Sequence, residues 1–459
     1  MPSVLFVNTR RSPLEVNATA LAAHRLGYDV VVLADREPPF ARELVAETHV
    51  VDTFDTAAAR AAALDLARRH DIQGVLTWGD RDVEFVSALA AELGLPGLPA
   101  EAARTVRNKY LTREALTAAG RSDLMPGYAR VHDEDSLRSA AGHVGFPAVL
   151  KPTSASGSRG IHRVDGEDEL AGEYELLSAF TRPERDPIFR ARPGELIYEE
   201  LLGGTEHSVE GVVVGDEPRI VGITDKWVTP DYSVEYLQIH PTALDPNRQL
   251  VVEELARETV RATGMRDCAF HLECRLLPDG TAKLLEVAGR IGGGYITSHL
   301  IPLATGIDFY AATIAVATGN APDLTPRTAF HAGSRQILSP RSGTFTGFAG
   351  LDTVLELPGV EHVAFDQAVG TRVALPPVDY MSCVLGSVIA RRGSHGAVRD
   401  VLEEAAESAD PVLTEPAVLP GTVLTEPAVL PGTVLTRPAD PVAGPGPHTS
   451  GRRLGRDAS

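Results

Sequence analysis

The chain lacks the residue patterns that mark several protein classes. Its only cysteines are Cys268, Cys274 and Cys383, and none of them forms a CxxC pair. Because they are odd in number, a disulfide framework is not expected, and we interpret them as core thiols. No apolar stretch reaches the roughly 20 residues that a membrane-spanning helix needs, and residues 1–10 lack the regions of a signal peptide. We therefore expect a cytoplasmic protein without a membrane partner.

Positive charge is also scarce. Acidic residues number 62 against 43 basic ones, which gives a formal net charge of -19. A nucleic-acid partner is therefore not expected, because binding would require clustered basic residues to neutralise its phosphates. A small anion needs only a few local cations and backbone N–H groups.

What is present indicates a globular chain of several domains. Hydrophobic residues make up 43% and charged residues 23%, which is typical of soluble proteins, and 459 residues exceed one ordinary core. The last part differs, because TEPAVLPGTVL at 414–424 recurs unchanged at 425–435 and proline is dense there. Proline at that density disfavours helix and sheet, so this segment is expected to be extended.

The first part of the chain predicts a parallel sheet covered by helices. Short β-branched runs at 4–7, 29–35 and 74–78 alternate with Ala-rich segments. No GxGxxG follows the first run, which argues against a dinucleotide site.

After the first part of the chain the pattern favours α+β domains. Strands are expected at 147–152, 195–201, 206–214, 219–226, 267–277 and 282–287, and helices at 248–262 and 396–406. The expected domains are 1–105, 106–195, 196–327, a small C-terminal domain at 328–410, and a disordered tail at 411–459.

Three segments carry residues suited to nucleotide chemistry. In the first, VLKPTSASGSRG at 149–160, Lys151 ends a strand and enters a loop of hydroxyl and glycine residues. The N–H groups of such a loop can wrap phosphate oxygens while the lysine adds a fixed charge. The Walker A order GxxxxGK[ST] is absent. Taken alone, a surface hairpin is an equally good interpretation.

The second segment is IYEELLGGTEHSVEG at 197–211, in which Glu206 can accept from a ribose and the backbone near Glu200 and Leu202 can contact an adenine edge. A solvated charged hairpin is the alternative. The third segment is 270–294. Two strands joined at 278–280 would place Glu273 and Glu286 side by side, as Mg²⁺ ligands or as an exposed acidic pair.

Together these segments resemble the ATP-grasp family over about residues 1–400. The resemblance implies ATP bound between two α+β lobes, after an N-terminal parallel-sheet domain and before a small C-terminal closing domain. It implies ATP contacts at Lys109, Lys151, Ser154, Ser156, Gly157, Ser158, Glu199, Glu200, Leu202 and Glu206, with Mg²⁺, or alternatively Mn²⁺, held by Glu273 and Glu286. The family usually has Asn where this chain has Ala288, so one oxygen ligand of the metal is missing.

Within the family the chain is most similar to L-amino acid ligases, on the segments ITDK at 223–226, QIHP at 238–241 and GSVIARRGS at 386–394. The resemblance implies that a carboxylate attacks the γ-phosphate of ATP and that an amine then displaces phosphate from the acyl phosphate. Arg290, Lys151 and Lys226 would neutralise charge, and His240 would act as a base or substrate contact. A structural role for His240 remains the simpler alternative.

Small-molecule carboxylates and amines, in particular amino acids, are the expected substrates, and a homodimer is a possible assembly. Another ATP-grasp reaction, of the carboxylase or nucleotide-precursor type, and a non-catalytic ATP-binding protein remain alternatives. An NAD-linked oxidoreductase is disfavoured by the missing glycine fingerprint.

Overall fold

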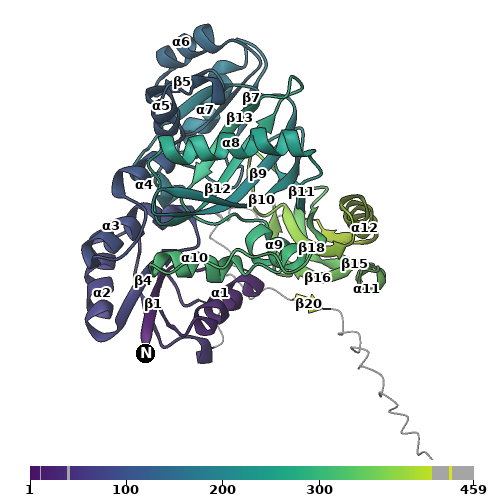
Figure 1. Ribbon diagram of the computed structural model, residues 1–459. Coiled ribbons are helices and arrows are strands. Elements are labelled where there is room, and N and C mark those ends of the chain that lie inside the picture. Colours follow the sequence, from purple (N-terminus) through teal and green to yellow (C-terminus); the bar gives the residue numbers. More distant parts are fainter. Residues whose placement is uncertain (11, 39–41, 416–433, 437–459) are drawn as a thin grey trace, which may run out of the picture.

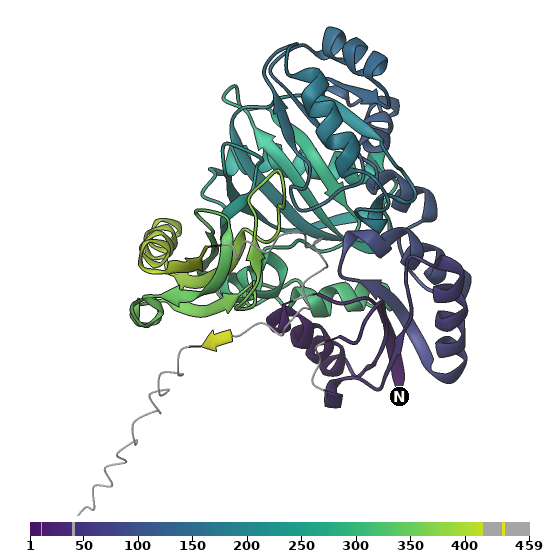
Figure 2. The same cartoon turned by 180° about the vertical axis from the view of Figure 1, so that it is seen from behind.

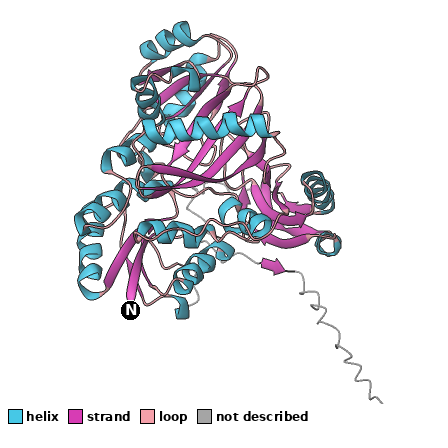
Figure 3. Ribbon diagram, viewed as in Figure 1, coloured by secondary structure: helices cyan, strands magenta, loops and turns pink. Residues whose placement is uncertain are grey.

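Four sheets organise the described part of the chain, residues 1–10, 12–38, 42–415 and 434–436 of the computed structural model. Figure 1 shows the N-terminal sheet in purple, a blue upper lobe, a large teal and green sheet in the middle, and the C-terminal elements in yellow-green at one side. Figure 3 shows helices covering the sheets and the long α8 crossing the large one.

The N-terminal sheet is parallel, as the sequence predicts. Its order is β3 (Glu47–Val50), β2 (Asp29–Ala34), β1 (Pro2–Val7) and β4 (Asp71–Thr77), and all three pairings are parallel. The flanking helices are α1 (Pro13–Arg25), α2 (Thr56–Arg69) and α3 (Val83–Leu93). Strand β3 has no apolar run that would predict it, because three of its four residues, ETHV, are polar and none of the four is fully buried.

A second sheet forms the upper lobe, with the order β5 (Tyr128–Val131), β8 (Leu196–Glu200), β6 (Ala148–Pro152) and β7 (His162–Val164). Helices α6 (Glu134–Val144) and α7 (Leu170–Phe180) belong to the same lobe, which follows α4 (Ala100–Val106) and α5 (Lys109–Ala118). The expected boundary between 195 and 196 is wrong, because β8 pairs with β5 and β6 and so completes this lobe.

The third and largest sheet has nine strands, in the order β13 (Ala282–Ala288), β12 (Cys268–Leu276), β9 (Thr205–Val214), β10 (Glu217–Val228), β11 (Glu235–His240), β14 (His331–Leu338), β18 (Val384–Arg392), β16 (Val360–Phe365) and β20 (Val434–Thr436). The pairing of β11 with β14 joins the first five strands of this sheet, β13 to β11, to its C-terminal strands. Figure 2 shows this continuity from behind.

Local sequence explains the ends of several elements around the large sheet. Helix α8 (Pro246–Ala262) starts where the Asp245 side chain accepts from two backbone N–H groups and proline takes the first position. The β12–β13 turn forms as predicted, with Gly280 at φ +87° and Asp279 accepting from the Thr281 N–H at 2.9 Å. The expected strands and helices of this region are all present within a few residues.

The apolar helix α10 (Phe309–Ala317) fixes the N-terminal sheet to the large sheet. It contacts α1, β4, β9 and β12, and most of its residues are buried. Gly74 of β4 permits this packing, since a Cβ there would lie 2.9 Å from the Ala317 carbonyl oxygen. The N-terminal domain is therefore held against the strands that carry the site.

A three-stranded sheet, β17 (Arg372–Val373), β15 (Gly343–Ala349) and β19 (Asp410–Thr414), completes the C-terminal part with helices α11 (Leu351–Glu356) and α12 (His395–Ser408). The expected tail boundary at 411 is wrong, because β19 pairs with β15 across it. Strand β20 is also part of the expected tail and pairs with β16. The rest of the tail, 416–433 and 437–459, lies outside the described residues.

No single helix in the described residues is long and apolar enough to cross a membrane. One bent pair, residues 296–305 and 309–317, passes the length and composition test together, with 116° between its two helices.

Candidate active site

The loop that follows β6 has the features expected of a phosphate-binding loop. Ser158 and Gly157 both have positive φ, +56° and +70°. In the described part of the chain the N–H groups of residues 154–158 donate to no protein acceptor, whereas the carbonyl oxygens of Ser154 and Ala155 accept from Arg107 and Lys109. The loop's donors are therefore available for an anion.

Helix α5 begins at Lys109 and faces this loop. The Asn108 side chain caps it by accepting from the Leu111 N–H at 3.1 Å. Lys109 Nζ donates to the Ala155 carbonyl at 2.8 Å and lies 2.9 Å from a Glu286 carboxylate oxygen. We call the space they enclose the α5 hollow, and its lining comprises Asp80, Val106, Arg107, Lys109, Thr112, Arg113, Thr153, Ala155, Ser156, Glu286, Val287 and Ala288.

The two predicted metal ligands lie side by side, as expected. Glu273 and Glu286 are direct partners across β12 and β13. Each one contacts a lysine from a different element, Lys226 for Glu273 and Lys109 for Glu286. The pair thus lies between the α5 hollow and the centre of the large sheet.

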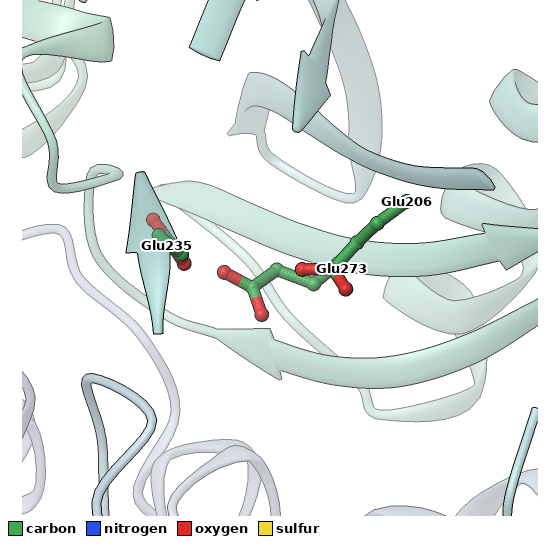
Figure 4. Close-up of side chains that lie close together, drawn as sticks. All are labelled: Glu206, Glu235 and Glu273. Atoms are coloured by element: carbon green, nitrogen blue, oxygen red, sulfur yellow. The ribbon is translucent and has the colours of Figure 1, made fainter. Parts of the chain in front are cut away.

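A buried charge cluster surrounds Lys226 on one face of that sheet. Its Nζ lies 2.5 Å from Glu235, 3.8 Å from Glu206 and in contact with Glu273; we call these four residues the Lys226 cluster. Figure 4 shows the three carboxylates, each from a different strand. One oxygen of each lies within 4.8 Å of the others. Although burial opposes the charge, these carboxylates hold the pKa of Lys226 well above its usual value.

Glu206, predicted as a ribose contact, is buried in this cluster and pairs with Arg275 at 2.8 Å. Burial raises its pKa to about 7.

Next to the Lys226 cluster, His271 lies 2.6 Å from Glu210 and 3.0 Å from Glu273. Burial opposes protonation of His271, but the two carboxylates raise its pKa to about 9. The imidazolium offsets part of the negative charge here.

The residues of the predicted adenine hinge separate into buried and open groups. Both Glu199 carboxylate oxygens are occupied, one by Arg113 at 2.8 Å and the other by Lys151 at 2.6 Å. Glu200 is half-exposed, and its N–H donates to Gly127. The Leu202 N–H has no acceptor in the described residues, so it remains available for a ligand. The side chain of Glu199 therefore serves to hold Lys151.

Arg290 follows β13 and is anchored by the N-terminal domain. It donates to Asp80 at 2.6 Å and to the Ile291 carbonyl at 2.8 Å. Asp80 also lies 3.6 Å from Arg107, and burial of this carboxylate is outweighed by the two guanidinium groups, which hold its pKa well below the usual range.

The glycines after Arg290 pack directly on the sheet face: a Cβ on Gly292 would meet Glu210, and one on Gly294 would meet Gln238.

His240 lies on the same sheet face but is sealed from solvent. It is 1% exposed, its Nδ1 lies 3.1 Å from the Thr224 hydroxyl, and burial lowers its pKa to about 4. The ring packs against Gly222. The structural role, the simpler of the two sequence interpretations, fits this environment better than a catalytic base.

Sequence reasoning missed three residues of the site. Asp80 and Arg113 line the α5 hollow, and Glu235 joins the Lys226 cluster. Only Glu235 had a local signal, because it opens EYLQIH, whose last four residues alternate apolar and polar as strand residues often do. The other two depend on contacts between distant segments.

Three segments of the chain match models of known protein families. Residues 144–299 match the ATP-grasp domain, 20–97 match the ATP-grasp N-terminal domain, and 335–414 match the L-amino acid ligase C-terminal domain 2. The chain therefore contains an ATP-grasp domain. These matches confirm the resemblance and the fold that the sequence predicts.

Individual proteins that are similar to this chain include one without a described activity, one ligase and one solved structure. An uncharacterized protein of Sinorhizobium fredii, y4rH, is 28% identical over 89% of this chain and 82% of its own length. Alanine–anticapsin ligase of Bacillus subtilis is 28% identical over 46% of this chain and 47% of that ligase, so the chain spans about half the length of this curated relative. The crystal structure of L-amino acid ligase from Bacillus licheniformis superposes with a TM-score of 0.77 at 22% identity, covering 90% of this chain and 99% of that one.

Proposed function

We propose that this ATP-grasp protein is a Mg²⁺- and ATP-dependent carboxylate–amine ligase that joins two amino acids, or similar small molecules, by an amide bond. The observation that carries the proposal is the α5 hollow, where Lys109, the loop after β6 and Glu286 meet. Lysine, free loop N–H groups and a carboxylate are the donor set that a metal-bound polyphosphate needs. The match at 335–414 favours the L-amino acid ligases over other ATP-grasp reactions.

In the first step a substrate carboxylate oxygen attacks the γ-phosphorus of ATP. The new O–P bond forms as the β–γ bridging bond breaks and ADP leaves. Lys109 and the loop N–H groups bind and orient the phosphates, and Arg290 neutralises charge on the transferred group. Arg290 is suited to this because Asp80 fixes its orientation.

Glu273 and Glu286 would hold Mg²⁺, which supplies charge neutralisation at the phosphates when it is bound. Their cross-strand pairing and their lysine partners fit this role, because the two carboxylates lie side by side and Glu286 lines the hollow. Ala288 lines the hollow without a side-chain oxygen, so fewer side-chain ligands are available than the family usually has.

In the second step the amine nitrogen attacks the acyl carbon, the C–N bond forms, and the C–O bond to phosphate breaks. The amine must also lose a proton, which the departing phosphate accepts. Glu235 is the better candidate to bind this amine, because its carboxylate is partly exposed on the site face, whereas His240 is sealed. Lys226 holds Glu235 in place at 2.5 Å.

The test is a screen of paired amino acids with ATP and Mg²⁺, measuring ADP, phosphate and the coupled product by mass. We expect one ADP and one phosphate for each amide formed. Formation of AMP and pyrophosphate would contradict the acyl-phosphate route. The cytoplasmic location, the homodimer and the absence of a nucleic-acid partner stay predictions.

A further inference from the structure

Helix α5 presents two cations to the same hollow. Lys109 and Arg113 are four residues apart, so they lie on one face of the helix, and both line the α5 hollow. Lys109 is expected to bind ATP from the family resemblance. Arg113 has no assigned role, although its side chain is fully buried.

The Arg113 guanidinium is held on two of its three nitrogens. Nε donates to Glu199 at 2.8 Å, and one terminal nitrogen donates to the Leu285 carbonyl at 2.7 Å. The other terminal nitrogen is buried and has no hydrogen-bond partner in the described part of the chain. A buried charged donor without a partner is costly, and such groups in native structures usually have a ligand or another explanation.

Positive charge exceeds negative charge around this nitrogen. Arg113 and Lys151 share the single carboxylate of Glu199, and Lys109 pairs with Glu286. Arg107 and Arg290 share Asp80. The lining of the hollow itself holds three cations, Arg107, Lys109 and Arg113, against two carboxylates, Asp80 and Glu286, so an anionic group entering the hollow would balance the excess.

We propose that Arg113 is a phosphate ligand of the nucleotide, a role that rests on the proposed function. Its unpaired terminal nitrogen donates to a phosphate oxygen next to Lys109. The other two nitrogens keep the guanidinium fixed against Glu199 and Leu285, and Glu199 in turn holds Lys151. The contact between Arg113 and phosphate is thereby linked, through Glu199, to the position of Lys151.

Arginine suits this position because its planar fork can donate in three directions at once. A lysine could retain the contact to Glu199 but would not supply the remaining fixed donor. Arg113→Lys therefore separates the phosphate contact from the charge pair with Glu199.

The experiment measures binding of ADP and of adenosine to the full chain in the presence of Mg²⁺, by calorimetry. We expect Arg113→Lys to weaken ADP binding by roughly ten- to a hundred-fold, which is the usual effect of losing a charged hydrogen bond, and to change adenosine binding by less than about twofold. The matched control is Arg104→Lys on α4, because Arg104 is exposed and pairs only with nearby Glu101. That variant should bind both ligands as the unmodified protein does.

A fall in the ADP-to-adenosine preference supports the phosphate contact, because Arg113→Lys keeps the charge pair with Glu199 and therefore leaves Lys151 in place. If Arg113→Lys retains the preference of the unmodified protein, Arg113 is structural and the inference is overturned while the ligase proposal stands. If the unmodified protein itself shows no preference for ADP, the proposed function fails and the inference fails with it. Should Arg113→Lys not fold, Arg113→Gln is measured in the same way.

Discussion

Arg290 and Asp80 lie 210 residues apart in the sequence and are joined by a hydrogen bond of 2.6 Å. The pair is buried, and it ties the loop after β13 to the end of β4 in the N-terminal domain. Because Asp80 also faces Arg107, one carboxylate orders two cations on one wall of the α5 hollow. The N-terminal domain thus contributes directly to the site, although it carries no nucleotide motif of its own.

The first prediction follows from this pair. Asp80→Asn should lower the free energy of unfolding by about 3–5 kcal/mol, because it leaves buried guanidinium groups without their carboxylate. Turnover should fall more than ADP binding. Combining it with Arg290→Gln should restore part of the stability but none of the activity.

Chemical denaturation and steady-state rates measure both effects. The control is Asp65→Asn, whose exposed pairs with Arg68 and Arg69 are screened by solvent and should contribute little to stability. Equal effects of Asp80→Asn and Asp65→Asn would contradict the assignment.

A second prediction concerns Glu286. Glu286→Gln keeps the shape but removes the charge, so if Glu286 holds Mg²⁺ the variant should stay folded and lose turnover by at least about a hundred-fold at ordinary Mg²⁺ concentration. Raising Mg²⁺ should recover part of the rate. Circular dichroism and phosphate release are the measurements, with exposed Glu175→Gln as the control. Near-normal product formation would remove Glu286 from the metal site.

Truncation of the C-terminus should have two different outcomes. A chain ending at 415 keeps β19 and loses only the three-residue edge strand β20 from the described part of the large sheet, so it should fold and turn over nearly normally. A chain ending at 409 loses β19, whose Leu413 pairs with Phe345 and covers a small apolar cluster. Its melting temperature should drop by several degrees. A large loss in the longer chain would show that residues after 415 stabilise the fold.

The pH dependence of stability should include a contribution from His299. Burial, with neighbouring His362, lowers its pKa to about 4, from 6.5 in the unfolded chain. The folded state therefore binds fewer protons below pH 6.5, so this stability is present above pH 6.5 and is lost as the pH falls toward 4.

One proton contributes a slope of at most about 1.4 kcal/mol per pH unit. His299→Gln should flatten the curve of unfolding free energy between pH 4 and 6.5, and exposed His132→Gln should not. An unchanged slope in His299→Gln would show that its protonation does not differ between the two states.

Local sequence patterns were enough to predict those parts of the fold and site that a single segment determines. The turn at 278–280 carries its own signal, and it placed Glu273 opposite Glu286 correctly. The boundary near 196 could not be found in this way, because β8 belongs with β5 and β6 only through sheet pairing. Likewise nothing near Asp80 indicates that its partner is Arg290. Contacts between distant segments depend on packing that no short window of sequence contains.

The pairing of β11 with β14 has a consequence for exchanging modules between ligases. The C-terminal family match starts at 335, inside β14, and Arg335 pairs there with Leu237 of the strand that carries Glu235. A chimera joined at 335 would divide one hydrogen-bonded strand between two parents and leave β11 beside a foreign edge. Recombination should instead be made in the irregular stretch 318–330, so that each parent donates an unbroken strand. Donor proteins would then have to be chosen for a compatible strand register before they are chosen for substrate preference.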